Sequence, residues 1–198
     1  PRFPVHPDGY AIYRPKQEWT DRGPEHQLDV AELVAATPQA YAALWRYLLD
    51  LDLVGSVRWR KAAVDEPVLD MLVDPRAVDR RVLDGLWLRL VDVDRALMSR
   101  RYASSVDVVL EVTDRFCPWN AGRWRLRTDG DGSATVTRTQ HAGHLALDVT
   151  DLAAAFLGGS TLTGLARSGR VVEHEPGTLL ATSRAFATDC APHCPEPF

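Results

Sequence analysis

The chain has 198 residues, of which 45% are hydrophobic and 25% charged, and its formal net charge is −4 at pH 7. This balance is ordinary for a globular protein of one large or two small domains, and it argues against nucleic acid or an anionic membrane surface as a partner. The sequence has no apolar run near the roughly 20 residues that a membrane span needs, no signal-peptide pattern, and only three cysteines, so we expect a cytoplasmic protein without a disulfide framework.

The first part of the chain alternates strands and helices. Thr37 and Pro38 predict a helix start, with the threonine as N-cap and the proline at the first helical position. The chain has no initiator methionine and starts beside what reads as a strand entered in mid-sheet, so we expect a fragment. The predicted elements are a strand over 9–14, a polar loop over 15–26, a strand over 28–34, a helix over 38–49, a strand over 54–59 and a short helix over 66–73.

A second part begins near residue 84 and contains a predicted hairpin over 107–126. Apolar Val108, Leu110 and Val112 alternate with polar residues, and a turn with Pro118 and Gly122 follows. Because strands come first and helices last, we predict an α+β fold with one sheet covered on one side. The predicted elements are strands over 85–91, 106–113, 123–127, 134–139 and 144–147, and helices over 92–101, 149–157, 162–168 and 178–188.

The glycine-rich stretches do not match phosphate-binding loops. Gly158–Thr161 follows a helix and has no lysine, whereas a phosphate cradle needs outward amides at a helix start after a strand. Thr161–Ala166 superficially echoes the Gln/Arg-x-x-Gly-x-Gly/Ala loop of acetyl-CoA binders, but its first position is wrong. We interpret both as structural turns.

Cys190, His193 and Cys194 lie close together near the end of the chain. With His174 from afar they would give a zinc site, but no fourth ligand has suitable local spacing, so we expect a packed terminal segment and no metal. Cys117 has no neighbouring pattern that marks a nucleophile.

Other chemistry-bearing residues have simple structural interpretations. His141 and His144 are expected on a surface or strand, and adjacent Asp65 and Glu66 as charges at a helix start. No Gly-x-Ser-x-Gly motif is present. Four tryptophans are expected in the core: Trp45, Trp59, Trp87 and Trp124.

Several short segments carry a resemblance to a known family. They are Leu-Trp-Arg-Tyr-Leu at 44–48, Asp-Leu-Val at 52–54, residues 84–93, Arg-Arg-Tyr-Ala at 100–103, the hairpin, Leu-Asp-Val at 147–149, Leu-Gly-Gly at 157–159, residues 166–171 and Cys-Pro-Glu-Pro-Phe at 194–198. In this order the chain resembles the C-terminal half of Eis-type (enhanced intracellular survival) acetyltransferases, which have an N-terminal catalytic GNAT domain, a central GNAT-like domain without cofactor and a sterol carrier protein-like domain.

The resemblance implies a fold and an activity. Residues 1–82 would be the later part of the central GNAT-like domain, and residues 83–198 the sterol carrier protein-like domain, a sheet with helices on one side. Acetyl-CoA would be bound by the absent N-terminal domain, so the chain alone would hold no cofactor and be inactive. The acceptors would be amines of aminoglycosides, polyamines or lysine, and the protein would be a hexamer.

The resemblance also implies two site residues. The family's C-terminal carboxylate helps to remove a proton from the substrate amine, and the matching group is that of Phe198. Glu196 is the nearest candidate for an acidic residue that lines the substrate pocket. A free α-carboxylate has a pKa near 3.5, so we expect it to position and attract a cationic amine rather than act as a strong base.

A lipid- or sterol-carrier module is the alternative function. Sterol carrier folds hold an apolar tunnel between sheet and helices, and the apolar faces over residues 149–157 and 178–186 of the predicted helices would line it. Such faces also make ordinary core.

Overall fold

A computed structural model of the chain describes residues 2–21 and 23–196, which form two compact units. Unit 1 runs through Leu83 and includes the residues from His193 onward, whereas unit 2 spans Asp84–Pro192. The domain boundary expected between residues 82 and 83 lies beside this division, while the terminal residues expected in the second domain group with unit 1. No helix in the described ranges is long and apolar enough to cross a membrane.

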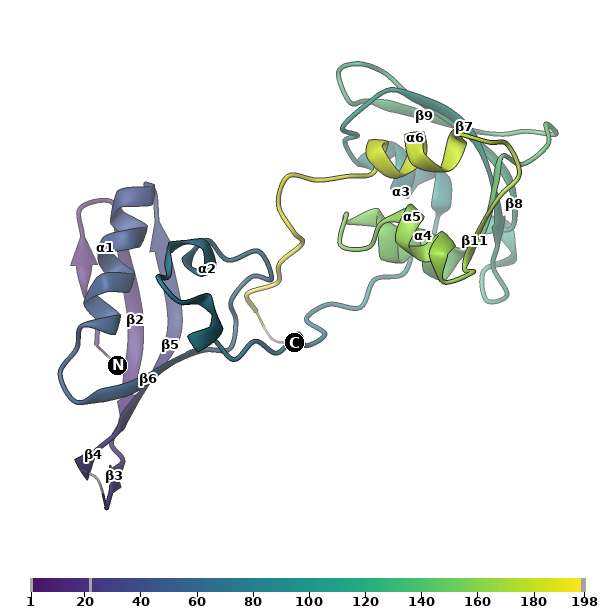
Figure 1. The fold of residues 1–198 in the computed structure, drawn as a ribbon. Helices are drawn as coiled ribbons and strands as arrows, with labels where there is room; N and C mark the ends of the chain where they lie inside the picture. The colour runs from purple at the N-terminus through teal and green to yellow at the C-terminus, as the bar shows by residue number, and fades with distance from the viewer. Residues whose placement is uncertain (1, 22, 197–198) are drawn as a thin grey trace. The chain divides into compact units, whose positions relative to one another are not determined.

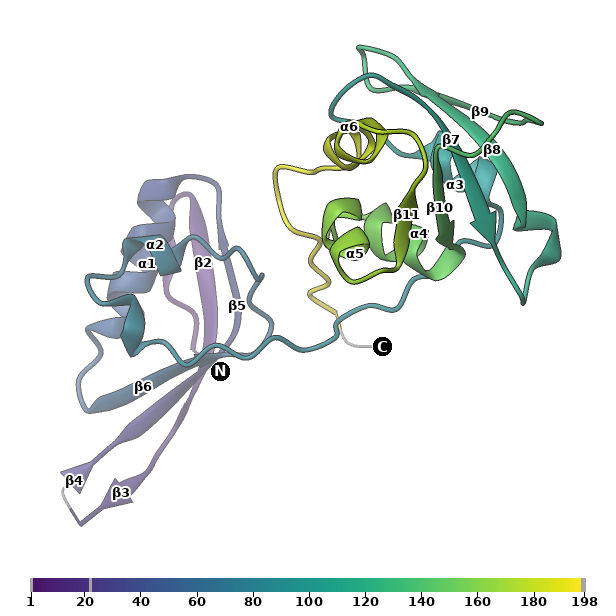
Figure 2. The same cartoon turned by 45° about the vertical axis from the view of Figure 1, so that its right-hand side comes forward.

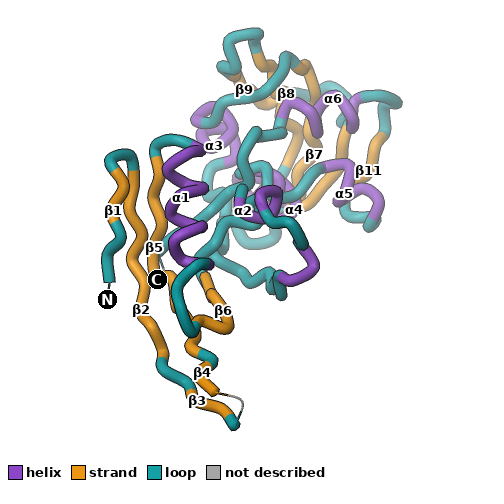
Figure 3. Tube along the Cα trace, turned by 60° about the vertical axis from the view of Figure 1, so that its left-hand side comes forward, coloured by secondary structure: helices purple, strands orange, loops and turns teal. Residues whose placement is uncertain are grey.

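Unit 1 is a mixed sheet in the strand order β1-β2-β5-β6, with a helix against one face (Figures 1 and 3). Strand β2 is antiparallel to β5, and β5 is parallel to β6 because α1 connects them. The elements are β1 (Val5–His6), β2 (Gly9–Lys16), β3 (Trp19–Thr20), β4 (Gly23–Pro24), β5 (His26–Ala35), α1 (Pro38–Leu49), β6 (Val54–Trp59), α2 (Val68–Met71) and a 3-10 turn at Pro75–Ala77.

Helix α1 closes the core of unit 1. The Ala40 amide donates to Thr37 Oγ1 at 3.2 Å, which confirms Thr37 as the N-cap. Leu44 and Leu48 are one turn apart and both buried against the sheet, because side chains four residues apart share a helix face. The loop predicted over 15–26 is wrong in part, since β2 continues to Lys16 and the antiparallel pair β3–β4 follows.

Unit 2 contains a curved mixed sheet in the order β11-β10-β7-β8-β9, with α4, α5 and α6 on the same side (Figure 2). Strand β10 runs parallel to β7, and the other neighbours are antiparallel. The elements are α3 (Val93–Ser99), β7 (Val106–Thr113), a 3-10 turn at Pro118–Asn120, β8 (Gly122–Thr128), β9 (Ala134–Arg138), β10 (Leu145–Asp148), α4 (Val149–Phe156), α5 (Leu162–Arg167), β11 (Val171–Glu173) and α6 (Thr178–Ala185).

The predicted hairpin is confirmed as β7 and β8. Val108 pairs with Leu126 and Leu110 with Trp124, so the alternation of apolar residues places one face of both strands in the core. That core also takes in buried residues of all the unit 2 helices described above. The opposite face carries ion pairs, such as Arg125 Nη2 to Asp107 Oδ2 at 2.7 Å.

The strand predicted over 85–91 is wrong. This segment has no regular secondary structure, and Trp87, expected in the core, is 83% exposed. Its apolar alternation looks like a strand, but no neighbouring strand pairs with it, and backbone groups need a partner for a strand to form. The helices predicted over 66–73, 92–101 and 178–188 are present but shorter, and strands β1 and β11 were not predicted.

Candidate functional site

The junction between β5 and α1 is the place in unit 1 where the topology favours a ligand. In a sheet with parallel strands, ligands bind beyond the carboxyl ends of those strands, at the start of the connecting helix. Strand β6 pairs with β5 only over residues 26–30, so residues 31–35 of β5 extend past the end of β6. A phosphate group would be expected here if unit 1 held one.

The first turn of α1 does not fit a phosphate. Pro38 has no N–H, the Ala40 amide donates to Thr37 Oγ1 at 3.2 Å, and the Tyr41 amide donates to the Thr37 carbonyl at 3.0 Å. Only the Gln39 amide of this turn is left for an anion, whereas a phosphate cradle uses several adjacent amides. The junction therefore lacks the donor set that a pyrophosphate needs.

The Glu66 carboxylate and the Tyr41 phenol form a hydrogen-bonded pair beside the first turn of α1. Tyr41 Oη donates to Glu66 Oε1 at 2.6 Å and accepts from the Val68 amide at 3.1 Å, and the Ala63 amide donates to Glu66 Oε2 at 3.1 Å. Burial, together with the neighbouring Glu66 carboxylate, raises the pKa of Tyr41. Glu66 thus binds a phenol on α1 rather than serving only as a helix-start charge, and its negative charge would further oppose an anion.

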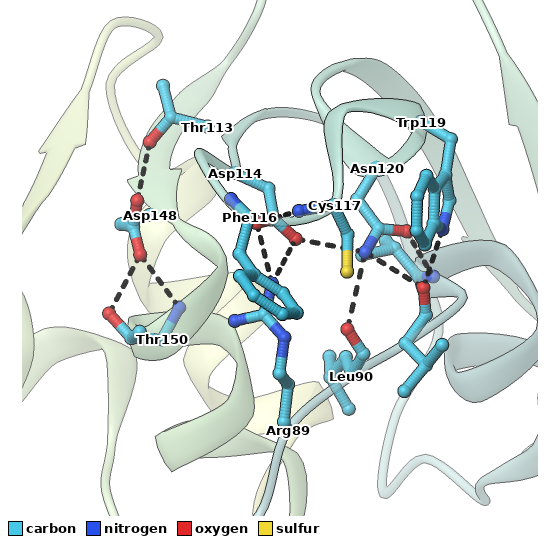
Figure 4. A network of polar contacts seen from close by, with 12 residues as sticks. Arg89, Leu90, Thr113, Asp114, Phe116, Cys117, Trp119, Asn120, Asp148 and Thr150 are labelled. Atoms are coloured by element: carbon cyan, nitrogen blue, oxygen red, sulfur yellow. Dashed lines mark hydrogen bonds and ion pairs between the residues drawn. The ribbon is translucent and has the colours of Figure 1, made fainter.

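Unit 2 contains a buried polar network centred on Asp114 (Figure 4). Arg89 Nη2 donates to both carboxylate oxygens of Asp114, at 2.6 and 2.8 Å. The amides of Phe116 and Cys117 donate to Oδ1 at 2.9 and 2.8 Å, and Asn120 Nδ2 donates to Oδ2 at 3.0 Å. The Asp114 side chain is only 1% exposed.

Electrostatics keeps Asp114 charged. Burial is the largest single effect and would raise its pKa, but the hydrogen bonds from Cys117, Asn120, Arg89 and Phe116 together outweigh it and hold the pKa at about 2. A carboxylate so well satisfied is a poor proton acceptor at neutral pH. The network is therefore better suited to structure than to acid–base chemistry.

The network attaches the segment before α3 to the turn between β7 and β8. Asn120 Oδ1 accepts from the Val93 amide at 3.0 Å, and Asn120 Nδ2 donates to the Leu90 carbonyl at 3.2 Å. Trp119 Nε1 donates to the Val91 carbonyl at 2.8 Å. These side chains give the backbone near residue 90 the partners that a neighbouring strand would otherwise supply. Sequence reasoning missed this network, because only the Asn in a Pro-x-Asn turn hinted at it.

The cysteines and histidines do not form a metal site among residues 2–21 and 23–196, where no group of three suitable ligands occurs. Cys117 is buried, which removes it from solvent. His144 Nε2 lies 3.3 Å from Glu175 Oε2, on the outer side of β7. A shallow hollow of about 630 Å³ lies there, lined by residues of both charge signs: Asp107, Val109, Arg125, His141–His144 and His174–Pro176.

The last six residues, 193–198, include the two residues implied by the family resemblance. Glu196 is exposed, and its carbonyl oxygen accepts from Cys194 Sγ at 3.2 Å. His193 Nε2 donates to the Lys61 carbonyl at 2.8 Å, within unit 1. Phe198 lies outside the described residues. The roles of Glu196 and Phe198 in substrate binding stay predictions.

The helix faces proposed to line a lipid tunnel are packed. Leu152 and Ala155 of α4 and Ala185 of α6 are fully buried in the apolar core of unit 2. Buried side chains in contact leave no room for an acyl chain unless the helices move. The apolar faces thus have the ordinary role of core.

Comparisons with known proteins agree with the two-part organisation. A family model described as "Acetyltransferase (GNAT) domain" matches residues 3–90, and one described as "Sterol carrier protein domain" matches residues 93–195. The chain is 46% identical over 190 residues to an uncharacterized N-acetyltransferase of Streptomyces avermitilis, covering 96% of the chain and 46% of that protein. It is 36% identical over 189 residues to the N-acetyltransferase Eis of Mycobacterium tuberculosis, covering 93% of the chain and 44% of that protein.

Solved structures show the same similarity. The crystal structure of Eis1 from Mycobacterium abscessus matches with a TM-score of 0.84 and 40% identity, over 98% of the chain and 49% of that chain. A GCN5-related N-acetyltransferase from Anabaena variabilis matches with a TM-score of 0.78 and 26% identity, over 93% and 46%. The chain thus spans about half the length of the curated relatives it matches.

Proposed function

The chain belongs to the Eis-like GNAT N-acetyltransferases, with a GNAT region followed by a sterol carrier protein domain, and from this membership we propose that it is the supporting part of an acetyl-CoA-dependent N-acetyltransferase. Family membership implies the use of acetyl-CoA. In this proposal the cofactor is held by residues outside the chain, and the chain supplies the scaffold, the subunit contacts of a hexamer and the terminal carboxylate.

The β5–α1 junction is the observation that carries this proposal. The GNAT match covers a unit whose strand-to-helix junction has Pro38 in its first turn and the Ala40 amide already bonded to Thr37. Two other helix starts are no better suited: Asp148 caps α4 with a carboxylate, and Glu173 Oε1 accepts from the Leu179 amide at 2.9 Å at the start of α6. These contacts support a cofactor site outside the described residues.

The terminal carboxylate of Phe198 would act on the amine acceptor. A negative charge beside a protonated amine attracts it and orients it for attack once its proton has gone to water or a base. Glu196 would add a second negative charge two residues earlier. Two such charges favour cationic acceptors, and the family resemblance implies amines of the aminoglycoside, polyamine or lysine type.

Removal of Phe198 from the natural protein that contains this chain tests the proposal. The turnover number should fall by about ten- to a hundredfold, because misplacement of a positioned group costs rate, whereas the KM for acetyl-CoA should stay constant. The release of coenzyme A measured with a thiol reagent gives both constants. A Glu25→Gln variant is a matched control, since Glu25 lies between β4 and β5 in unit 1. Unchanged turnover without Phe198 would contradict the proposed role.

A lipid-carrier role is the second candidate, and the sterol carrier protein match is the observation that favours it. The packed core of unit 2 counts against it. Displacement of a fluorescent fatty acid from micromolar protein would support the carrier role, and no displacement would argue for a purely structural domain.

A further inference from the structure

Arg100 joins the carboxyl ends of two helices in unit 2. Its Nη1 donates to the Phe156 carbonyl at 2.7 Å, and its Nη2 donates to the Phe186 carbonyl at 3.0 Å. Phe156 is the last residue of α4, and Phe186 caps α6. The last carbonyls of a helix have no partner within the helix, and a cation there also complements the helix dipole. Arg100 therefore fixes both helix ends with one side chain.

Aromatic rings surround the Arg100 guanidinium. Its Cζ atom lies 4.7 Å from the centre of the Tyr102 ring, 4.5 Å from that of Phe186 and 5.8 Å from that of Phe156. None of the ion pairs within the described ranges includes Arg100. A guanidinium held by carbonyls and ring faces is bound in one geometry, because the planar fork matches both acceptors at once. These contacts fix Phe186, the residue after which the terminal segment (residues 187–192) leaves α6.

The terminal segment packs against Gly158 and Gly159, which follow α4. Gly158 has a φ of +84°, and a Cβ there would collide with the Thr188 hydroxyl. A Cβ on Gly159 would come within 2.9 Å of Pro192 Cγ. Thr188 Oγ1 in turn donates to the Cys190 carbonyl at 2.8 Å. The terminal segment thus lies so close to Gly158 and Gly159 that a side chain at either position would collide with it.

We propose that Arg100 and the Gly158-Gly159 pair form a binding surface, here called the seat, that holds residues 187–192 in one position on unit 2. This inference rests on the proposed function, since it gives the seat a purpose in placing the Phe198 carboxylate. Arg100, Gly158 and Gly159 are then positioning residues for acetyl transfer, although none of them touches the reacting atoms.

A spin label tests the seat without any assay of activity. In a Cys194→Ser background a nitroxide on exposed Cys190 reports the mobility of the segment, because Cys117 is buried. Gly159→Ala should convert the restricted spectrum to a mobile one, since the new methyl group pushes Pro192 away. Gly130→Ala is the matched control, because a Cβ there meets nothing within 4 Å. An unchanged spectrum in Gly159→Ala would overturn the seat.

Kinetics of the natural protein then tests the positioning role. Gly159→Ala should lower kcat by about tenfold and leave the KM for acetyl-CoA unchanged. Adding Pro192→Ala removes the ring atoms that the methyl group meets, so the double variant should regain the kcat of Pro192→Ala alone. If loss of Phe198 lowers turnover but Gly159→Ala does not, the inference fails while the proposed function stands. If loss of Phe198 has no effect on turnover, the proposed function fails, and the spin-label spectrum still tests whether the seat holds residues 187–192.

Discussion

The Asp114→Asn substitution tests whether the buried network holds unit 2 together. The side chain is 1% exposed and accepts from Arg89, two backbone amides and Asn120. An asparagine places an NH₂ group against one set of these donors and removes the charge opposite Arg89. Breaking a buried pair by changing one partner typically costs about 3–5 kcal/mol, because the other charge loses its compensation. We expect a loss of about 3 kcal/mol in the free energy of unfolding.

Asp107→Asn is the matched control for this prediction. Asp107 also has a pKa of about 2, mainly because Arg125 bonds it, but its side chain is 43% exposed on the outer face of β7. Surface ion pairs contribute roughly 0–1 kcal/mol, and salt screens them. The two carboxylates thus have similar pKa values and very different expected contributions.

Urea unfolding of the whole chain measures the difference, with hydrogen exchange of the β7 and β8 amides used to follow unit 2 separately from unit 1. High salt should reduce the small effect of Asp107→Asn and leave that of Asp114→Asn. If Asp114→Asn cost no more than Asp107→Asn, burial of the network would not be the source of stability, and the reasoning would be refuted.

Further predictions concern pH and single side chains. The folded pKa of Asp114, about 2, lies below its ordinary value of 3.8, so the ionised carboxylate should contribute roughly 2 kcal/mol to the free energy of unfolding. This contribution should be complete above about pH 5 and be lost as the pH falls toward 2. Unfolding measured as a function of acid pH should show less of this loss in Asp114→Asn. Thr37→Ala removes the α1 cap and should cost about 1 kcal/mol, whereas Thr37→Ser should cost less in the same urea titration. Trp124→Ala should cost about 3–5 kcal/mol because its ring is in the core, whereas exposed Trp87→Ala should cost almost nothing, and equal losses would contradict the placement of Trp87.

Local patterns predicted much of the fold because their causes are local. The alternation along β7 and β8 and the capping of α1 by Thr37 depend on nearby residues, and both are confirmed. The segment over 85–91 has a strand pattern too, but a strand also needs a neighbour, and sequence alternation does not say whether one exists. Arg89 reaches an aspartate 25 residues away, which no local spacing reveals.

The candidate site was less accessible to sequence reasoning. Glu196 and Phe198 came from the family resemblance rather than from any chemical pattern, and their roles stay predictions. Arg100 belongs to a segment noted for that resemblance, but its contacts with Phe156 and Phe186 lie 56 and 86 residues away. Tertiary contacts of this range depend on helix packing, which residue spacing alone does not encode.

Calorimetry of this 198-residue chain with acetyl-CoA tests the central claim most directly. Because the β5–α1 junction has Pro38 and a capped Ala40 amide where a pyrophosphate would need free donors, we predict no binding heat at millimolar cofactor. Stoichiometric binding at micromolar acetyl-CoA would contradict the account, since it would place the cofactor site within this chain.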